Sequence, residues 1–152
     1  FVVVFDTHAV NPSLIPNLPF DTKRDLAPVM LVATGPMVIT AHRSQPYKTF
    51  AELLAAARAK PATIGYGSIG IPGFDASAWW GVLAPAKTPA PIIQRMNAEL
   101  KKILDDAKVR ERLTAQGMDI EASSPEALGK FVDEQVDRWA KVVKEFGIRA
   151  GD

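Results

Sequence analysis

The chain of 152 residues contains no cysteine, which excludes disulfide bonds, thiol nucleophiles and cysteine-ligated metal sites. It contains two histidines, His8 and His42, and neither belongs to a spacing that presents paired imidazoles to a metal ion. No apolar run approaches the roughly 20 residues that a membrane-spanning helix needs. The sequence therefore predicts no metal site and no bound cofactor, and it shows no transmembrane helix.

The chain also lacks an excess of charge of either sign. Eighteen lysines and arginines oppose seventeen acidic residues, which leaves a net charge of +1. No basic stripe with interleaved aromatic residues is present, so nucleic acid is not expected as a partner. With 47% hydrophobic and 23% charged residues, the composition is that of one globular domain with a substantial core.

Motifs for catalysis are missing as well. There is no Gly-x-Ser-x-Gly sequence and no other recognisable pairing of a nucleophile with a base. Residues 65–70 fit the Gly-x-Gly-x-x-Gly pattern of dinucleotide sites, but Ile71-Pro72-Gly73 breaks the helix that this motif must open. A small α/β enzyme is therefore the least favoured class, and only a measurable turnover that is abolished by changing His8 would support it.

The pattern of apolar residues predicts an α/β fold, a mixed sheet flanked by helices. The apolar run at residues 1–5 is typical of a strand buried on both faces, and it predicts that a further segment precedes it. A proline-marked loop over residues 6–25 is expected to follow. Further strands are predicted over residues 26–33, 37–41, 63–66 and 74–84, with an edge strand over 118–121.

Four helices are predicted, and each has a recognisable start. A capping box of Thr49 and Glu52 opens the first, and Thr88-Pro89 opens the second. The third runs from about Asp106 to a glycine cap at Gly117, and the fourth from Ser124 to about Phe146. The buried stripes are expected to be Phe50, Leu53, Leu54 and Ala57; then Ile93, Met96, Leu100 and Ile103; then Leu128, Val132, Trp139, Val143 and Phe146.

Two neighbouring tryptophans, Trp79 and Trp80, fall on opposite faces of the predicted strand over residues 74–84. At least one of them is expected to pack in the core beneath a helix. The alternative, an aromatic ligand site, is the less favoured interpretation.

Residues 66–74 contain three glycines and a proline between two predicted strands. Glycine admits backbone angles closed to other residues, and proline removes a backbone donor, so this stretch predicts a turn, a bulge or a hinge. A simple surface loop between two strands is the alternative.

Polar groups follow the first predicted strand, at the position where open α/β sheets present their ligand loops. Thr7 and Asn11 carry hydrogen-bonding side chains, and Thr7 and His8 offer backbone donors. The alternative is that Asn11-Pro12 merely caps a short helical turn toward Leu14.

Several short motifs resemble the Bug/TctC family, the periplasmic solute-binding receptors of tripartite tricarboxylate transporters. They occur in consistent order along nearly the whole chain. These motifs are Thr7-His8-Ala9-Val10-Asn11-Pro12, Pro19-Phe20-Asp21, Tyr66-Gly67-Ser68, Pro72-Gly73-Phe74, Ala84-Pro85-Ala86, Thr88-Pro89, Asn97-Ala98-Glu99-Leu100 and Val109-Arg110-Glu111-Arg112-Leu113.

The resemblance implies a two-lobed fold of the periplasmic binding protein type II kind, which closes around a small carboxylate such as a dicarboxylate, tricarboxylate or amino acid. It implies ligand-binding residues at Thr7, His8 and Asn11 on one loop and at Tyr66, Gly67 and Ser68 on another. Backbone amides suit this task because they donate hydrogen bonds without burying a charge. The implied partners are the membrane components of the transporter, and the implied location is the periplasm.

The chain departs from the family pattern at Gly70-Ile71, where the resemblance implies that a whole second lobe should intervene. The sequence is therefore interpreted as a single lobe over residues 1–152. Residues 1–70 form its first segment, and residues 71–152 form a return segment with the C-terminal helices. Weak or no carboxylate binding is expected from such a fragment. The alternative function is a single-lobe interaction or dimerisation module without a small ligand, which self-associates through an exposed sheet edge.

Overall fold

The computed structural model describes residues 2–4, 6–36, 43–60, 78–145 and 147. The chain forms two compact units. The larger unit comprises Phe1–Pro36 and Ala76–Asp152, and the smaller unit comprises Met37–Asp75. The predicted boundary between segments 1–70 and 71–152 lies outside the described residues and stays a prediction.

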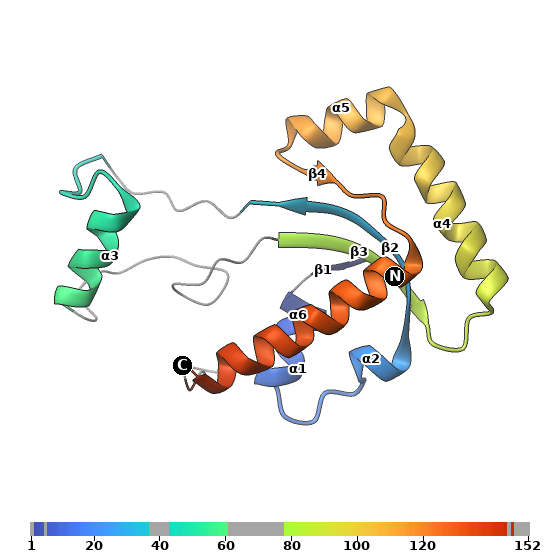
Figure 1. Ribbon diagram of the computed structural model, residues 1–152, viewed down its shortest axis with the longest axis horizontal. Helices are drawn as coiled ribbons and strands as arrows, with labels where there is room; N and C mark the ends of the chain where they lie inside the picture. The colour runs from blue at the N-terminus through green and yellow to red at the C-terminus, as the bar shows by residue number, and fades with distance from the viewer. Residues whose placement is uncertain (1, 5, 37–42, 61–77, 146, 148–152) are drawn as a thin grey trace. The chain divides into compact units, whose positions relative to one another are not determined.

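A four-stranded sheet forms the centre of the larger unit, with the strand order β1-β3-β2-β4 (Figure 1). Its strands are β1 (Val2–Val4), β2 (Leu26–Gly35), β3 (Ala78–Pro85) and β4 (Asp119–Ile120). Helices flank the sheet, which confirms the predicted α/β class. The three pairings among these strands are all antiparallel, so the parallel pairing that a mixed sheet requires is not among them.

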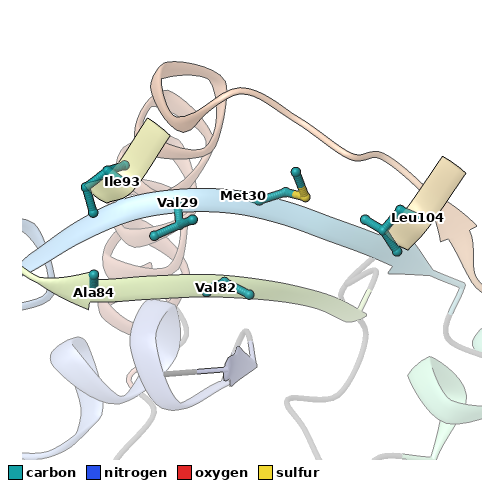
Figure 2. Close-up of a cluster of buried hydrophobic side chains, with 6 residues drawn as sticks. All are labelled: Val29, Met30, Val82, Ala84, Ile93 and Leu104. Carbon is teal, nitrogen blue, oxygen red and sulfur yellow. The ribbon is translucent and has the colours of Figure 1, made fainter. Parts of the chain in front are cut away.

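One face of the sheet is covered by α4 (Ala90–Asp105), which α5 (Ala107–Ala115) follows along the chain (Figure 1). Figure 2 shows the core beneath α4, in which side chains from the helix meet side chains from β2 and β3. Burial of this apolar surface is the main stabilising term for the layer. The buried residues of this core are Val29, Met30, Val82, Ala84, Ile93 and Leu104.

The other face is covered by α6 (Pro125–Glu145), which contacts β2. Trp79 lies in this layer with 1% of its surface exposed, and its ring meets Phe131 of α6 edge-on with centroids 5.5 Å apart. The expectation that a tryptophan packs beneath a helix is therefore confirmed. A Cβ at Gly81 would lie 3.3 Å from the Trp79 ring, so the absence of a side chain there lets the indole lie against the strand.

Asn97 links α4 to β2 and to the segment that follows β4. Its Nδ2 donates to the carbonyl oxygens of Val29 at 2.7 Å and Ser123 at 2.8 Å. The register of β2 against β3 is irregular between Pro28 and Met30, so the Val29 carbonyl falls at an interruption of the ladder. The side chain of Asn97 thus donates a hydrogen bond to the Val29 carbonyl oxygen, a backbone acceptor that the interrupted strand pairing leaves without a partner.

Three details of the helices differ from the sequence prediction. Thr88 does not cap α4, because Pro89 occupies the cap position without a side-chain hydrogen bond. Ile103 is 55% exposed and Leu104 is buried in its place, and Val142 rather than Val143 is buried in α6. Adjacent residues of a helix point in directions about 100° apart. Only one of two adjacent apolar residues can therefore face the sheet fully, and in both helices it is the neighbour of the predicted residue.

The predicted start of the short helix at Asp106 and the edge strand near Ile120 are confirmed. Asp106 caps α5 by accepting from two backbone N–H groups, and Gly117 ends the region with φ at 78°, a conformation that favours glycine. The β4 strand pairs with the end of β2 and lies at one edge of the described sheet.

The described part of the smaller unit is dominated by α3 (Phe50–Ala59). The predicted capping box is confirmed, since Thr49 Oγ1 accepts from the Glu52 backbone and the Glu52 carboxylate accepts from the Thr49 backbone. The predicted buried stripe is wrong for Phe50, which is 60% exposed, and none of the α3 residues is fully buried.

Residues 6–25, predicted to be a loop, are largely helical. A π-helical turn η1 (Asp6–Val10) continues into α1 (Asn11–Leu14), and α2 (Thr22–Asp25) precedes β2. Both η1 and α1 contact α6. Within the described residues, none of the helices has the length and apolar character needed to cross a bilayer.

Candidate functional site

The candidate ligand segment, defined here as residues 6–14, leaves the sheet at the carboxyl end of β1. Strands β1 and β2 both run antiparallel to β3, so their carboxyl ends lie at the same end of the sheet. The pairs Val4–Trp80 and Gly35–Ala78 mark this end. The first segment of the larger unit ends one residue after β2, at Pro36.

The structure brings Thr7, His8 and Asn11 together on the helical run formed by η1 and α1. Thr7 and His8 belong to the first turn, which follows β1 directly. The first backbone N–H groups of a helix have no acceptor within that helix, and the helix dipole places partial positive charge there. This arrangement can hold an anion without any cationic side chain.

Asn11 is the first residue of α1 and is half-buried. Its carbonyl oxygen accepts from the Ile15 backbone at 2.9 Å and closes the turn. The cap position itself is Val10, and no side-chain hydrogen bond caps this helix. The helical turn toward Leu14 is therefore present, but the Asn11 side chain does not cap it.

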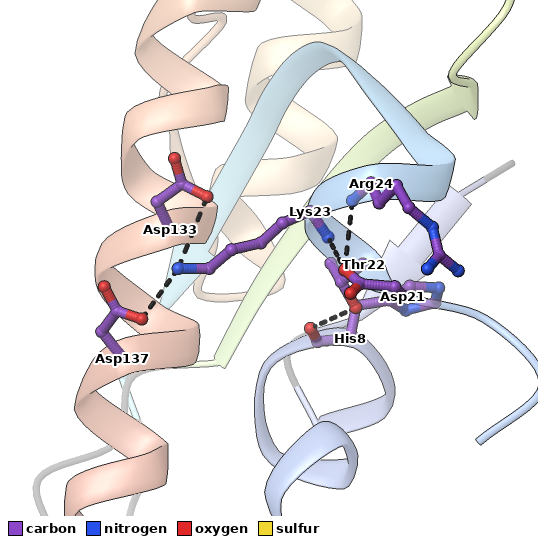
Figure 3. A network of polar contacts seen from close by, with 7 residues as sticks. All are labelled: His8, Asp21, Thr22, Lys23, Arg24, Asp133 and Asp137. Carbon is purple, nitrogen blue, oxygen red and sulfur yellow. Dashed lines mark hydrogen bonds and ion pairs between the residues drawn. The ribbon is translucent and has the colours of Figure 1, made fainter. Parts of the chain in front are cut away.

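His8 is half-buried, and its backbone and ring are both held by residues that follow the candidate ligand segment. Its carbonyl oxygen accepts a hydrogen bond of 2.9 Å from Thr22 Oγ1 (Figure 3). Its imidazole ring lies against the ring of Phe20, with centroids 5.4 Å apart and an interplanar angle of 32°. Thr22 is 5% exposed, so its hydroxyl depends on this partner in place of water.

The short helix α2 is held in place by a capping residue and by charges. The Asp21 side chain accepts from the backbone N–H groups of Lys23 and Arg24, at 2.9 Å and 3.1 Å. Figure 3 shows the Lys23 ammonium reaching α6, where it lies 2.7 Å from Asp137 Oδ1 and 3.8 Å from Asp133 Oδ1. The hydrogen bond to Asp137, with the charges of both aspartates, raises the pKa of Lys23.

Asp25 ends α2 and pairs with its neighbour in sequence. Arg24 Nε and Nη2 donate to the two carboxylate oxygens at 2.8 Å and 2.9 Å, and the Asp21 backbone N–H donates at 2.8 Å. The Arg24 guanidinium, followed by the Asp21 backbone donor, holds the pKa of Asp25 at about 2. Because both donors of this bidentate pair bind Asp25, the Arg24 guanidinium is held next to α2.

The structure does not locate the second predicted ligand loop, because Tyr66, Gly67 and Ser68 lie outside the described residues. Within the described ranges, no group of three or more histidine, cysteine, aspartate or glutamate side chains could hold a metal ion. The anchoring role of Thr22 was missed in the sequence. The available signal was Asp21, a helix-capping residue type four positions before Asp25, an acidic residue that follows two cationic ones.

Comparison with protein families identifies this architecture. Residues 1–73 and 69–148 match the model of TctC, the tripartite tricarboxylate transporter family receptor. Because these two matches together cover most of the chain, the chain belongs to this family.

Among curated proteins, the chain is similar to the UPF0065 protein in the tcbD-tcbE intergenic region of Pseudomonas sp. strain P51. The two are 35% identical over 81 residues, which cover 53% of this chain and 24% of that protein. It is also 34% identical over 89 residues to Protein BugT of Bordetella pertussis, covering 59% of this chain and 27% of BugT. The chain thus spans about a quarter of the length of each of these relatives.

Solved structures show the same fold at low sequence identity. R. palustris Rpa4515 with adipate has a TM-score of 0.81 at 18% identity, with 97% of this chain and 77% of that chain covered. The periplasmic binding protein BugD has a TM-score of 0.76 at 20% identity, with coverage of 97% and 78%. MatC from Rhodopseudomonas palustris with bound malate has a TM-score of 0.74 at 21% identity, with coverage of 93% and 78%.

Proposed function

We propose that this chain is part of an extracytoplasmic receptor that captures a small carboxylate for a tripartite tricarboxylate transporter. The observation that carries the proposal is the position of Thr7 and His8 in the first turn of a helical run at the carboxyl end of β1. Oriented backbone amides at a helix start stabilise an anion there. Membership of the receptor family supports the same role.

The proposed contacts are the backbone amides of Thr7 and His8 and the side chain of Asn11, with Tyr66, Gly67 and Ser68 contributing from a second loop. Thr22 and Phe20 act indirectly, since they hold His8 in place. Adipate and malate are bound in two proteins of similar fold, and we extend that ligand class to this chain. The solute is received in the periplasm and delivered to the membrane components of the transporter, and no reaction is catalysed.

Affinity for this chain alone is expected to be weak. A short helical turn supplies only a few neutral donors, and these must offset the entropy lost when a small ligand is immobilised. We expect a dissociation constant of about 1 mM, which is weak but measurable. Isothermal calorimetry with malate and adipate tests this, with diaminobutane of similar length and opposite charge as the control. Submicromolar binding of a carboxylate would contradict the proposed partial site, and preference for the diamine would contradict the proposed ligand class.

A second candidate function is self-association through the sheet. The strand order places β1 at one edge of the described sheet, with its inner side paired to β3. An edge strand presents backbone donors and acceptors on its outer side and can pair with another chain. Light scattering across a hundredfold range of protein concentration tests this function. A mass that rises toward the dimer supports it, and a monomer at every concentration would exclude it.

A further inference from the structure

Trp79 carries a polar group that the packing of the larger unit leaves unused. The side chain is 1% exposed, and within the described part of the chain its Nε1–H has no hydrogen-bond partner. Most buried indole N–H groups find an acceptor, because leaving a buried donor unpaired costs free energy. An acceptor supplied by a ligand would remove that cost.

The contacts of the ring show which way this donor faces. A Cβ at Gly81 would lie 3.3 Å from Trp79 Cζ3 and 3.5 Å from Leu128 Cδ1, so the six-membered ring lies against Gly81 beneath α6. Nε1 belongs to the five-membered ring, on the far side of the indole from Cζ3. The N–H group therefore faces away from Gly81 and from the middle of β3.

The sheet register places Trp79 at the end of the sheet where the candidate ligand segment begins. Trp79 pairs with Thr34 close to the start of β3, and its neighbour Trp80 pairs with Val4, the last residue of β1. The segment that contains Thr7 and His8 begins two residues after Val4. The turn η1 contacts α6, the helix that also covers Trp79. Trp79 and the segment thus share one end and one face of the sheet.

We propose that Trp79 Nε1–H is a further donor to the bound carboxylate, either directly to a carboxylate oxygen or through one bound water. This inference rests on the proposed function, because it requires a ligand at the Thr7–His8 turn. A neutral indole donor suits the site for the same reason as the backbone amides: it binds an anion without bringing a second charge out of water. Trp80 packs near Gly35 and serves as the matched residue on the same strand.

The test is a nuclear magnetic resonance titration of the full ¹⁵N-labelled chain with sodium malate, against sodium chloride at equal ionic strength. The chain has three tryptophans, so three indole N–H resonances are expected, and the Trp79→Phe and Trp80→Phe variants assign two of them. We expect the Trp79 resonance to move saturably with the same midpoint as the backbone amides of Thr7 and His8. The Trp80 resonance should stay in place.

The affinity of the two variants completes the test. Trp79→Phe should bind malate about tenfold more weakly, the usual effect of removing one donor to a charged group, whereas Trp80→Phe should stay within about twofold. If the amides of Thr7 and His8 respond while the Trp79 indole does not, this inference is overturned and the proposed function stands. If none of these resonances responds, both are overturned. If Trp79→Phe fails to fold, sequential assignment of the wild-type spectrum identifies the Trp79 indole resonance, so the wild-type titration still decides.

Discussion

The Thr22 hydroxyl donates a 2.9 Å hydrogen bond to the carbonyl oxygen of His8, and this bond joins α2 to the candidate ligand segment. Thr22 is buried, so water does not readily replace the bond. The position of η1 therefore depends on a residue fourteen positions further along the chain.

Replacing Thr22 with valine keeps the shape of the side chain and removes the donor. We expect the free energy of unfolding to fall by about 1 kcal/mol, and by no more than about 3 kcal/mol, because a partly buried carbonyl loses its partner. Urea denaturation measures the change. Thr114→Val, at an exposed position of α5, is the matched control and should change stability by less than about 0.5 kcal/mol. Equal effects of the two variants would show that the His8 bond contributes nothing.

Asn97 is expected to be a major stabilising polar residue of the larger unit. Asn97→Ala removes two hydrogen bonds and should lower the free energy of unfolding by about 2 kcal/mol. Asn97→Asp should cost more, because a carboxylate would face two carbonyl oxygens that it cannot donate to. Thermal and urea unfolding check both values.

The control for Asn97 is Gln94→Ala, at an exposed position of the same helix, which should be nearly neutral. Recovery of the wild-type stability by Asn97→Asp would contradict the donor role, since only the amide nitrogen donates to Val29 and Ser123.

The ion pairs of Lys23 should contribute little, despite their short distances. The Lys23 side chain is 39% exposed and that of Asp137 is 65% exposed, so water and salt screen the attraction. A double-mutant cycle of Lys23→Met and Asp137→Asn should give a coupling energy below about 1 kcal/mol. The coupling should decrease further in 1 M sodium chloride, a concentration at which the screening length is only about 3 Å. A larger coupling that salt leaves unchanged would show that the pair is buried in solution.

Acid stability should depend on Asp25. The pKa of its carboxyl is about 2 in the folded chain, below the reference value of 3.8, because Arg24 and the Asp21 backbone N–H favour the charged form. The unfolded state therefore binds the proton first as pH falls. The stabilising contribution is fully present above the reference pKa and is lost between about pH 4 and pH 2.

Urea denaturation at intervals between pH 2 and pH 5 measures this contribution. Asp25→Asn should flatten the decline of stability in that range, whereas Gln94→Ala, at an exposed position of α4 and without a titratable group, should leave the slope as in the wild type. An unchanged slope in Asp25→Asn would contradict the role of the Arg24 pair.

The sequence predicted most of the regular elements because their signals are local. The capping box at Thr49 and the glycine at Gly117 act within a few residues of themselves, and the structure confirms both. The helices over residues 6–25 escaped prediction because η1 and α1 are short and contact α6, more than a hundred residues away. The Lys23 contacts to α6 are equally distant in sequence. Tertiary contacts of this kind leave no periodic pattern.

In the candidate site, too, local features could be predicted from the sequence and tertiary contacts could not. Thr7, His8 and Asn11 could be selected because they follow a strongly apolar strand. The anchoring of His8 by Thr22 and Phe20 depends on how α2 folds back, which no spacing in the sequence specifies. The indole N–H of Trp79 could not be singled out either, since the sequence indicates only that Trp79 and Trp80 lie on opposite faces of one strand.

Residues 6–14 are proposed to hold a carboxylate. A backbone amide map of the whole ¹⁵N-labelled chain during titration with malate tests it most directly. We expect saturable shifts that are largest at Thr7 and His8, with no comparable shifts in α3 or α5. Shifts that are largest around the lysines of α6, or no saturable shifts at all, would contradict it.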